Sequence, residues 1–151
     1  MSDFKIEGLD ELKEDIEKVV KISSDIAYDT VHDAAKEFKK QLSKNVKKGV
    51  KTSKNITKGF KVTKPTGSKM NLESNFMAEG KGGNAHFHLI ENGHDIVMPY
   101  RRNNKTRKDG GDRKGFVPGK KFVPKTLKEF EPTYVEKMEE MIERVLEKGE
   151  L

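Results

Sequence analysis

Three histidines, His86, His88 and His94, lie close together in the sequence and are the residues best suited to hold a metal ion. Imidazole is a common zinc ligand, and the alternation of an extended chain would place His86 and His88 on one strand face. The nearest acids are Glu91 and Asp95, and the chain has no cysteine to complete a structural zinc site. We therefore interpret these histidines as solvated or hydrogen-bonded side chains and assign no metal ligand.

The other reactive side chains form no recognisable catalytic motif. The run Gly80-Lys81-Gly82-Gly83 lacks the spacing of a phosphate-binding loop and is more typical of a hairpin turn. No serine stands in a nucleophile-elbow sequence, and the lack of cysteine removes both a thiol nucleophile and disulfides. The sequence predicts a protein that is not an enzyme and that uses no cofactor.

Two long amphipathic helices are predicted, one towards each end of the chain. From Leu9 to Val46 apolar residues recur at steps of three and four, with acids in the first turns and lysines in the last. A helix over these 38 residues would be about 57 Å long, so it either breaks near Ser23-Ser24 or projects and packs on another subunit. A second apolar stripe predicts a helix that starts near Pro124, is kinked or split at Pro132, and ends at Gly149.

Short strands are predicted between these helices. A strand over Ala85–Glu91 follows from its alternating apolar residues, and Asn92-Gly93 ends it. The other predicted elements are a short strand at Phe60–Val62, a turn at Pro65–Gly67, a strand at Met70–Ala78 and an edge strand at Phe4–Ile6. The expected fold class is α+β, with both helices packed on an antiparallel sheet of three to four strands in a single domain, residues 1–151.

Charge is separated into blocks along the chain. The net charge is −6 over residues 1–35, +11 over 36–69, −3 over 70–100, +7 over 101–121 and −3 over 122–151. Such blocks allow the acidic surface of one subunit to meet the basic surface of another, or a basic face to meet nucleic acid. A set of solvated surface lysines is the third interpretation. Because only 32% of residues are hydrophobic, the core must be small.

The segment Arg101–Gly115 is predicted to be a long basic loop. Its few apolar residues cannot compensate for the entropy lost on ordering, so we expect it to be mobile in the free subunit and ordered by assembly. The candidate interaction residues are the basic side chains of this segment, namely Arg101, Arg102, Lys105, Arg107, Lys108, Arg113 and Lys114.

Two motifs flank this loop. They are His88-Leu89-Ile90-Glu91-Asn92-Gly93-His94 and Pro118-Gly119-Lys120-Lys121-Phe122-Val123-Pro124-Lys125-Thr126-Leu127. Together with the order of elements, they resemble the small head–tail joining (tail-completion or neck) proteins of tailed bacteriophages and prophages. The candidate structural motif residues are Glu91, Gly93, Pro118, Phe122 and Pro124. We expect Phe122, held between the two prolines, to be buried against the sheet and the first helix.

The resemblance implies a virion structural protein that joins the tail to the head as one of several copies in a neck ring. Its partners would be other neck and tail proteins, and its location the virion neck or tail after synthesis in the cytoplasm of the bacterial host. The N-terminus lacks a signal-peptide apolar region, and no apolar run approaches the roughly 20 residues that span a bilayer, so no membrane partner is expected.

The alternative is a small basic nucleic-acid-binding protein that neutralises phosphates with its lysine-rich stretches. Only Phe60 and Phe116 lie within those stretches to stack on bases, and no helix-turn-helix or zinc-finger pattern is present. A combined role also remains, in which a basic ring lumen makes non-specific contact with DNA.

Overall fold

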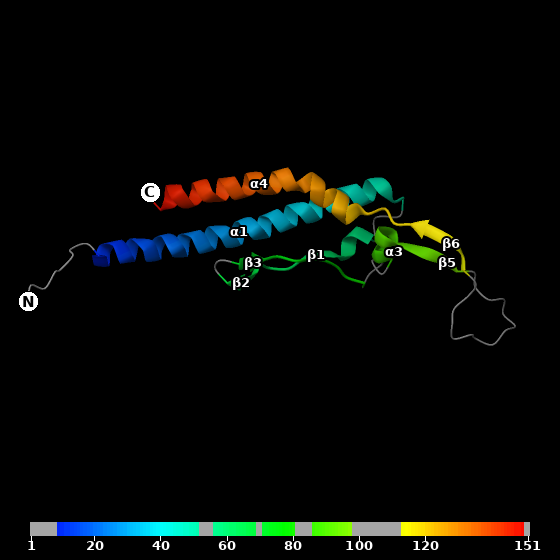
Figure 1. Cartoon of the computed structure of the whole chain (residues 1–151), viewed down its shortest axis with the longest axis horizontal. Helices are drawn as coiled ribbons and strands as arrows, with labels where there is room; N and C mark the ends of the chain where they lie inside the picture. The colour runs from blue at the N-terminus through cyan, green and yellow to red at the C-terminus, as the bar shows by residue number, and fades with distance from the viewer. Residues whose placement is uncertain (1–8, 52–55, 69–70, 81–85, 98–112, 150–151) are drawn as a thin grey trace, which may run out of the picture. The chain divides into compact units, whose positions relative to one another are not determined.

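The computed structural model describes residues 9–51, 56–68, 71–80, 86–97 and 113–149, with the backbone alone for residues 9–12. Its elements, labelled in Figure 1, are α1 (Leu9–Gly49), η1 (Thr57–Gly59), β1 (Phe60–Val62), β2 (Thr66–Ser68), β3 (Asn71–Glu73), β4 (Phe76–Ala78), α3 (Phe87–Asn92), β5 (Gly93–Val97), β6 (Arg113–Pro118) and α4 (Phe122–Lys148). Two long helices with short strands between them confirm the predicted α+β class.

The strands of the described residues pair two by two. The pairs are β1–β4, β2–β3 and β5–β6, where the sequence predicted one sheet of three to four strands. The β5–β6 pair is antiparallel, with Gly93 opposite Pro118 and a bulge between Ile96 and Val97. The expected edge strand at Phe4–Ile6 lies outside the described residues.

Helix α1 runs without interruption from Leu9 to Gly49, which excludes the first of the two alternatives, a break near Ser23-Ser24. The Ser23 hydroxyl donates to the Val20 carbonyl at 2.9 Å, and the Thr30 hydroxyl donates to the Ile26 carbonyl at 2.8 Å. Hydroxyl groups that bond within the preceding turn are compatible with a continuous helix. At 41 residues α1 is roughly 60 Å long.

Helix α4 begins two residues before Pro124 and continues through Pro132, and so the predicted split at Pro132 is not present. Gly149 follows its last residue as expected, and the Gly149 N–H donates to the Val145 carbonyl at 2.9 Å. No helix in the described parts of the chain is both long enough and apolar enough to cross a bilayer.

The predicted strand at Ala85–Glu91 is wrong, because Phe87–Asn92 is the short helix α3. In a window this short, apolar residues fit a period of 2 and a period of 3.6 equally well. The helix is selected by contacts distant in sequence, since the Ile90 and Glu91 carbonyls accept hydrogen bonds from the N–H groups of Lys120 and Lys121 at 2.8 and 3.2 Å.

Two further predictions in the strand region are corrected. The turn expected at Pro65–Gly67 is strand β2, with Gly67 opposite Leu72 of β3. The strand expected over Met70–Ala78 is interrupted at Ser74-Asn75, where the Ser74 hydroxyl bonds the Thr63 carbonyl at 2.8 Å and Thr63 also bonds the Asn75 backbone. Side chains that hydrogen-bond backbone groups compete with strand pairing and divide the segment into β3 and β4. The strand predicted at Phe60–Val62 is confirmed as β1.

The chain divides into two compact units, and α1 and α4 each contribute to both. Unit 1 comprises residues 1–39, 62–76 and 130–151, and unit 2 comprises residues 40–61 and 77–129. That residues 1–151 form one domain stays a prediction.

Unit 1 is built on an antiparallel pair of helical segments, the first part of α1 and the last part of α4, which lie side by side in Figure 1. The Phe38 ring meets the rings of Phe76 and Phe130 edge-on, with centroids 6.0 and 5.8 Å apart. Lys137 bonds Glu37 at 2.9 Å, and this hydrogen bond raises the pKa of Lys137 above its ordinary value.

Unit 2 has its core where the end of α1 meets the start of α4. Leu42, Val46 and Thr126 are fully buried there. The Phe60 and Phe87 rings meet edge-on with centroids 4.9 Å apart, which adds a second aromatic contact. Aromatic pairs of this geometry stabilise a core beyond the area they bury.

Leu42→Ala should lower the free energy of unfolding by about 2–5 kcal/mol, because it removes a fully buried side chain and leaves a cavity. The matched control is Leu127→Ala, since Leu127 is 59% exposed on α4 in the same unit. The control should change stability by less than about 0.5 kcal/mol. Denaturant unfolding measures both, and equal effects would contradict the assignment of the core.

Candidate assembly site

The side chain of Glu91 is buried and caps the first turn of α4. The backbone N–H of Phe122 donates to one carboxylate oxygen at 2.7 Å, and the N–H of Val123 donates to the other at 3.1 Å. The first N–H groups of a helix have no partner within the helix, and its N-terminus attracts negative charge. The carboxylate at the end of α3 therefore fixes where α4 begins.

The remaining backbone donors of this first turn are also accounted for. Pro124, at the third helical position, has no N–H, and the Lys125 N–H bonds the Lys121 carbonyl at 3.4 Å. Proline is well tolerated there because its missing donor would have had no helical acceptor. Lys121, just ahead of the helix, has φ 53°, a left-handed conformation that is uncommon for a residue with a side chain.

Two glycines allow the two motifs to come into contact. Gly93 has φ 88° and ψ 169°, a conformation that only glycine adopts readily. A Cβ on Gly119 would collide with backbone atoms of Glu91, Asn92 and Gly93. The structure therefore brings Glu91, Gly93, Pro118 and Phe122 together at one junction between α3–β5 and β6–α4.

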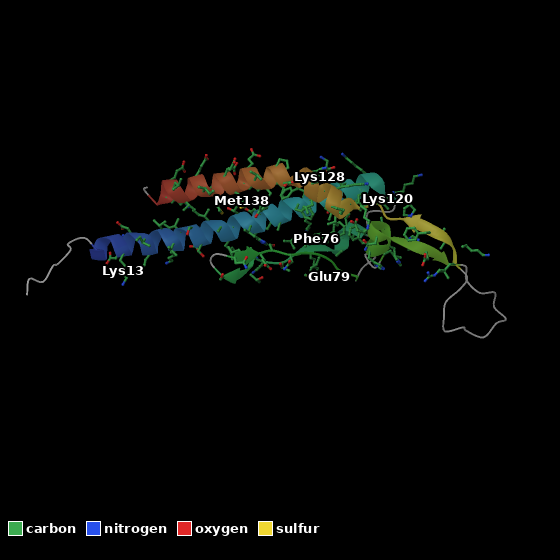
Figure 2. The ribbon with its side chains drawn as sticks, in the orientation of Figure 1. Lys13, Phe76, Glu79, Lys120, Lys128 and Met138 are labelled. Carbon is green, nitrogen blue, oxygen red and sulfur yellow. The ribbon has the colours of Figure 1, made fainter. Side chains whose placement is uncertain are left out.

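The end of α1 is tied to this junction by Asn45, which the sequence did not single out, and by Lys120 and Thr126 of the second motif. The Asn45 side-chain amide donates to the Thr126 hydroxyl and to the Glu129 carboxylate, both at 2.9 Å. The Lys120 ammonium, labelled in Figure 2, donates to the Gly49 carbonyl at the end of α1. In the sequence, Asn45 could have been noticed only as a polar residue between two apolar positions of the α1 stripe, Leu42 and Val46.

Phe122 is half-buried, where the sequence predicted a side chain buried against the sheet and the first helix. Its ring packs on Gly49, since a Cβ at that glycine would lie 2.5 Å from the Phe122 Cζ atom. The side chain thus contacts the first helix, as expected, but remains partly open to solvent.

The β5–β6 hairpin extends from the junction with apolar side chains exposed. Phe116 is 60% exposed, and the other exposed apolar residues of the hairpin are Ile96, Val97 and Val117. All six residues of β6 are exposed. A hairpin of two strands is at best marginally stable in water on its own.

Five of the predicted interaction residues, Arg101, Arg102, Lys105, Arg107 and Lys108, lie outside the described residues. Arg113 and Lys114 belong to strand β6, and so the predicted loop to Gly115 is wrong over residues 113–115. Pairing with β5 supplies partners for Arg113 and Gly115, and Lys114 is the extra residue at the bulge between them. The Arg113 Nε atom lies 3.3 Å from an Asp95 carboxylate oxygen, an exposed ion pair that adds little stability.

The histidines do not share a strand face as predicted. His86 precedes α3, His88 lies within it, and His94 is in β5. His94 Nδ1 is a buried atom with no hydrogen-bond partner. Among the described residues, no group of three or more His, Asp or Glu side chains is placed to hold a metal ion.

The two units carry opposite charge. Over the described residues, unit 2 has 13 basic and 4 acidic side chains, a net charge of +9. Unit 1 has 9 basic and 16 acidic side chains over its described residues, a net charge of −7. The charge blocks of the sequence are thus gathered into one basic and one acidic unit.

Comparison with protein families supplies the identification. A family model described as "Bacteriophage HK97-gp10, putative tail-component" matches residues 10–93, more than half of the chain. The chain belongs to the HK97-gp10-like family. Comparison with curated proteins and with solved structures gives no match.

Membership of the HK97-gp10-like family confirms the resemblance to the tailed-phage proteins predicted from the sequence. The matched segment runs from α1 through α3 to Gly93, so it contains Glu91 and the first half of the junction. The second half, in β6 and α4, follows the matched segment. The capping hydrogen bonds therefore join the part of the chain shared with the family to the part beyond it.

Glu91→Ala should lower the free energy of unfolding by about 2–3 kcal/mol, because two backbone N–H groups of α4 lose their acceptor. Glu91→Gln keeps one oxygen acceptor and should cost less. The control is Glu131→Ala, which removes an exposed acid of α4 and should stay within about 0.5 kcal/mol of the native protein. Urea unfolding distinguishes these cases, and a Glu91→Ala protein as stable as the control would refute the capping role.

Gly119→Ala should be far more destabilising than Gly115→Ala, by at least about 1 kcal/mol. A methyl group at position 119 meets rigid backbone, whereas at position 115 it meets only the Ile96 Cδ1 atom at 3.7 Å. Thermal melting of the two variants measures the difference. Equal melting temperatures would show that α3 and the β6–α4 connection are not in close contact.

Proposed function

We propose that this protein joins the phage tail to the head, as a subunit of a neck or tail-completion ring in the virion. The role is structural and non-enzymatic, and its partners are other neck and tail proteins. The chain is made in the host cytoplasm, from a free phage or a prophage genome. Family membership supports a tail component, and the exposed β5–β6 hairpin is the observation that carries a role in joining proteins.

The physical argument is that a partner covering the hairpin would stabilise it. Four large apolar side chains are open to solvent on two paired strands. Phe116 and Val97 lie on one face of the hairpin and Ile96 and Val117 on the other, because successive strand residues point to opposite faces. A hairpin that exposes apolar side chains on both faces is a candidate protein contact site. The junction at Glu91 anchors the base of the hairpin to α4, so a protein that binds the hairpin would also be connected to α4.

The basic charge of unit 2 also suits contact with DNA passing through a ring. Net positive charge attracts phosphates without reading sequence, because bases are recognised by contacts in the grooves. We propose such contact only as a non-specific feature of the ring lumen. A dedicated nucleic-acid binder would need several stacking aromatics, and of the two phenylalanines in the basic stretches Phe60 is buried and Phe116 is exposed.

Loss of this protein from a producing phage should leave DNA-filled heads and separate, complete tails, because each part assembles but the joint is missing. Electron micrographs of lysates measure this, and the wild-type gene supplied in trans is the control. A lysate without tails would place the protein in tail-tube assembly, and normal particles would refute the proposal.

Binding of the isolated protein to duplex DNA should be weak at about 150 mM salt and should fall further as salt rises. Equally weak binding to unrelated sequences is expected, since phosphates alone are contacted. Fluorescence anisotropy with labelled duplexes measures this. Tight binding at that salt concentration would make nucleic-acid binding the primary function.

A further inference from the structure

A second unpartnered apolar surface lies on α4 in unit 1. Val135, Ile142 and Leu146 are 49%, 52% and 47% exposed, and their spacing of seven and four residues places them along one stripe of the helix. This stripe, which we call the 135–146 stripe, is distinct from the row of α4 that contacts α1 through Phe130 and Lys137.

Acidic side chains border the 135–146 stripe. Glu139 lies between Val135 and Ile142 on the same stripe, and Glu136 and Glu143 lie beside it on the helix, all three exposed. The surface is therefore apolar along its centre and negative along one side.

The β5–β6 hairpin has the complementary composition. One face of the hairpin carries the exposed apolar side chains of Phe116 and Val97, together with the Arg113–Asp95 ion pair, because residues opposite each other in the ladder share a face. The basic Lys114 follows Arg113 in β6. Lys114 is the extra residue at the bulge, since Val97 pairs with Arg113 and Ile96 pairs with Gly115. Bulges commonly redirect a side chain towards a site of contact.

The two surfaces also match in length. Six residues of strand extend about 20 Å, and the eleven helical steps from Val135 to Leu146 extend about 17 Å. Exposed apolar side chains therefore occur on both surfaces beside charges of opposite sign, and the strand is long enough to span the stripe.

We propose that the β5–β6 hairpin of one copy of this chain docks on the 135–146 stripe of a second copy. This inference rests on the proposed ring function and identifies the two surfaces that build the ring. The contact joins two different patches, so each subunit has one hairpin that docks and one stripe that receives the hairpin of a neighbour. Repeated contacts of this kind close into a ring or continue as a filament.

The docking proposal is tested with two variants, and in each of them an introduced carboxylate disables one of the two surfaces. Phe116→Asp disables the hairpin and Ile142→Asp disables the stripe, and both positions are more than half exposed, so the fold should tolerate them. Each variant alone should associate at least roughly tenfold more weakly than the wild type in sedimentation velocity.

An equimolar mixture of the two variants should form a heterodimer and nothing larger. The intact hairpin of the Ile142→Asp protein would bind the intact stripe of the Phe116→Asp protein, and no other pair of surfaces is complete. Two outcomes would overturn the proposal: a mixture that behaves as the sum of its parts, or a wild-type protein that stays monomeric at millimolar concentration.

The matched control is Ile16→Asp. Ile16 is 54% exposed on α1 in the same unit, outside the proposed contact, so this variant should assemble as the wild type does. Loss of assembly in the control would show that any added carboxylate disrupts the oligomer, and would overturn the assignment of surfaces.

Phage complementation separates this inference from the proposed function. Both single variants should fail to restore tail attachment where the control succeeds. If both variants restore it fully, the docking contact is wrong while the joining function stands. If the deletion itself leaves attachment intact, the joining function is wrong, and the sedimentation result still decides the contact.

Discussion

The architecture around the candidate site depends on one buried carboxylate. Glu91 accepts hydrogen bonds from the Phe122 and Val123 N–H groups, 31 and 32 residues later in the chain. It satisfies two of the N–H donors that the start of α4 leaves without partners. The N-terminal end of α4 also favours a nearby negative charge. Because buried polar groups without partners are costly, neither the acid nor the helix end is stable in place without the other.

The Glu91 cap fixes the start of α4 whatever the length of the segment that connects β5 to β6. Gly93 pairs with Pro118, and Gly119 packs directly on the backbone of Glu91, Asn92 and Gly93. The chain is therefore closed at the base of the hairpin, where β5 begins and β6 ends. Since the entropic cost of a loop rises only slowly with its length, residues can be added beyond the base without displacing the helix. A tail protein can thus vary its contact surface while keeping its scaffold.

The sequence predicted the parts of the fold that long periodic patterns determine. The apolar stripes of α1 and α4 recur over many turns, so both helices were found with their ends within a few residues. Most of the strands are only three residues long, which is too short for a period of two to be distinguished from a helix or turn. The junction was anticipated only as two motifs, and the hydrogen bonds of Glu91 could not be predicted because they join distant residues. Of the basic residues chosen as contacts, Arg113 and Lys114 can be placed, and both lie on a strand where a loop was expected.

The proposed assembly would couple stability to subunit contact through the distribution of the apolar residues. Among the described residues, thirteen large apolar side chains are exposed and eight apolar side chains are buried. A small core contributes little free energy, and a partner that covers exposed apolar surface stabilises the folded state by mass action. An isolated subunit is therefore expected to be marginal, and its hairpin the least stable part of the described structure. The same apolar residues that weaken the free subunit would then strengthen the assembled one, which favours completion of an assembly over accumulation of single subunits.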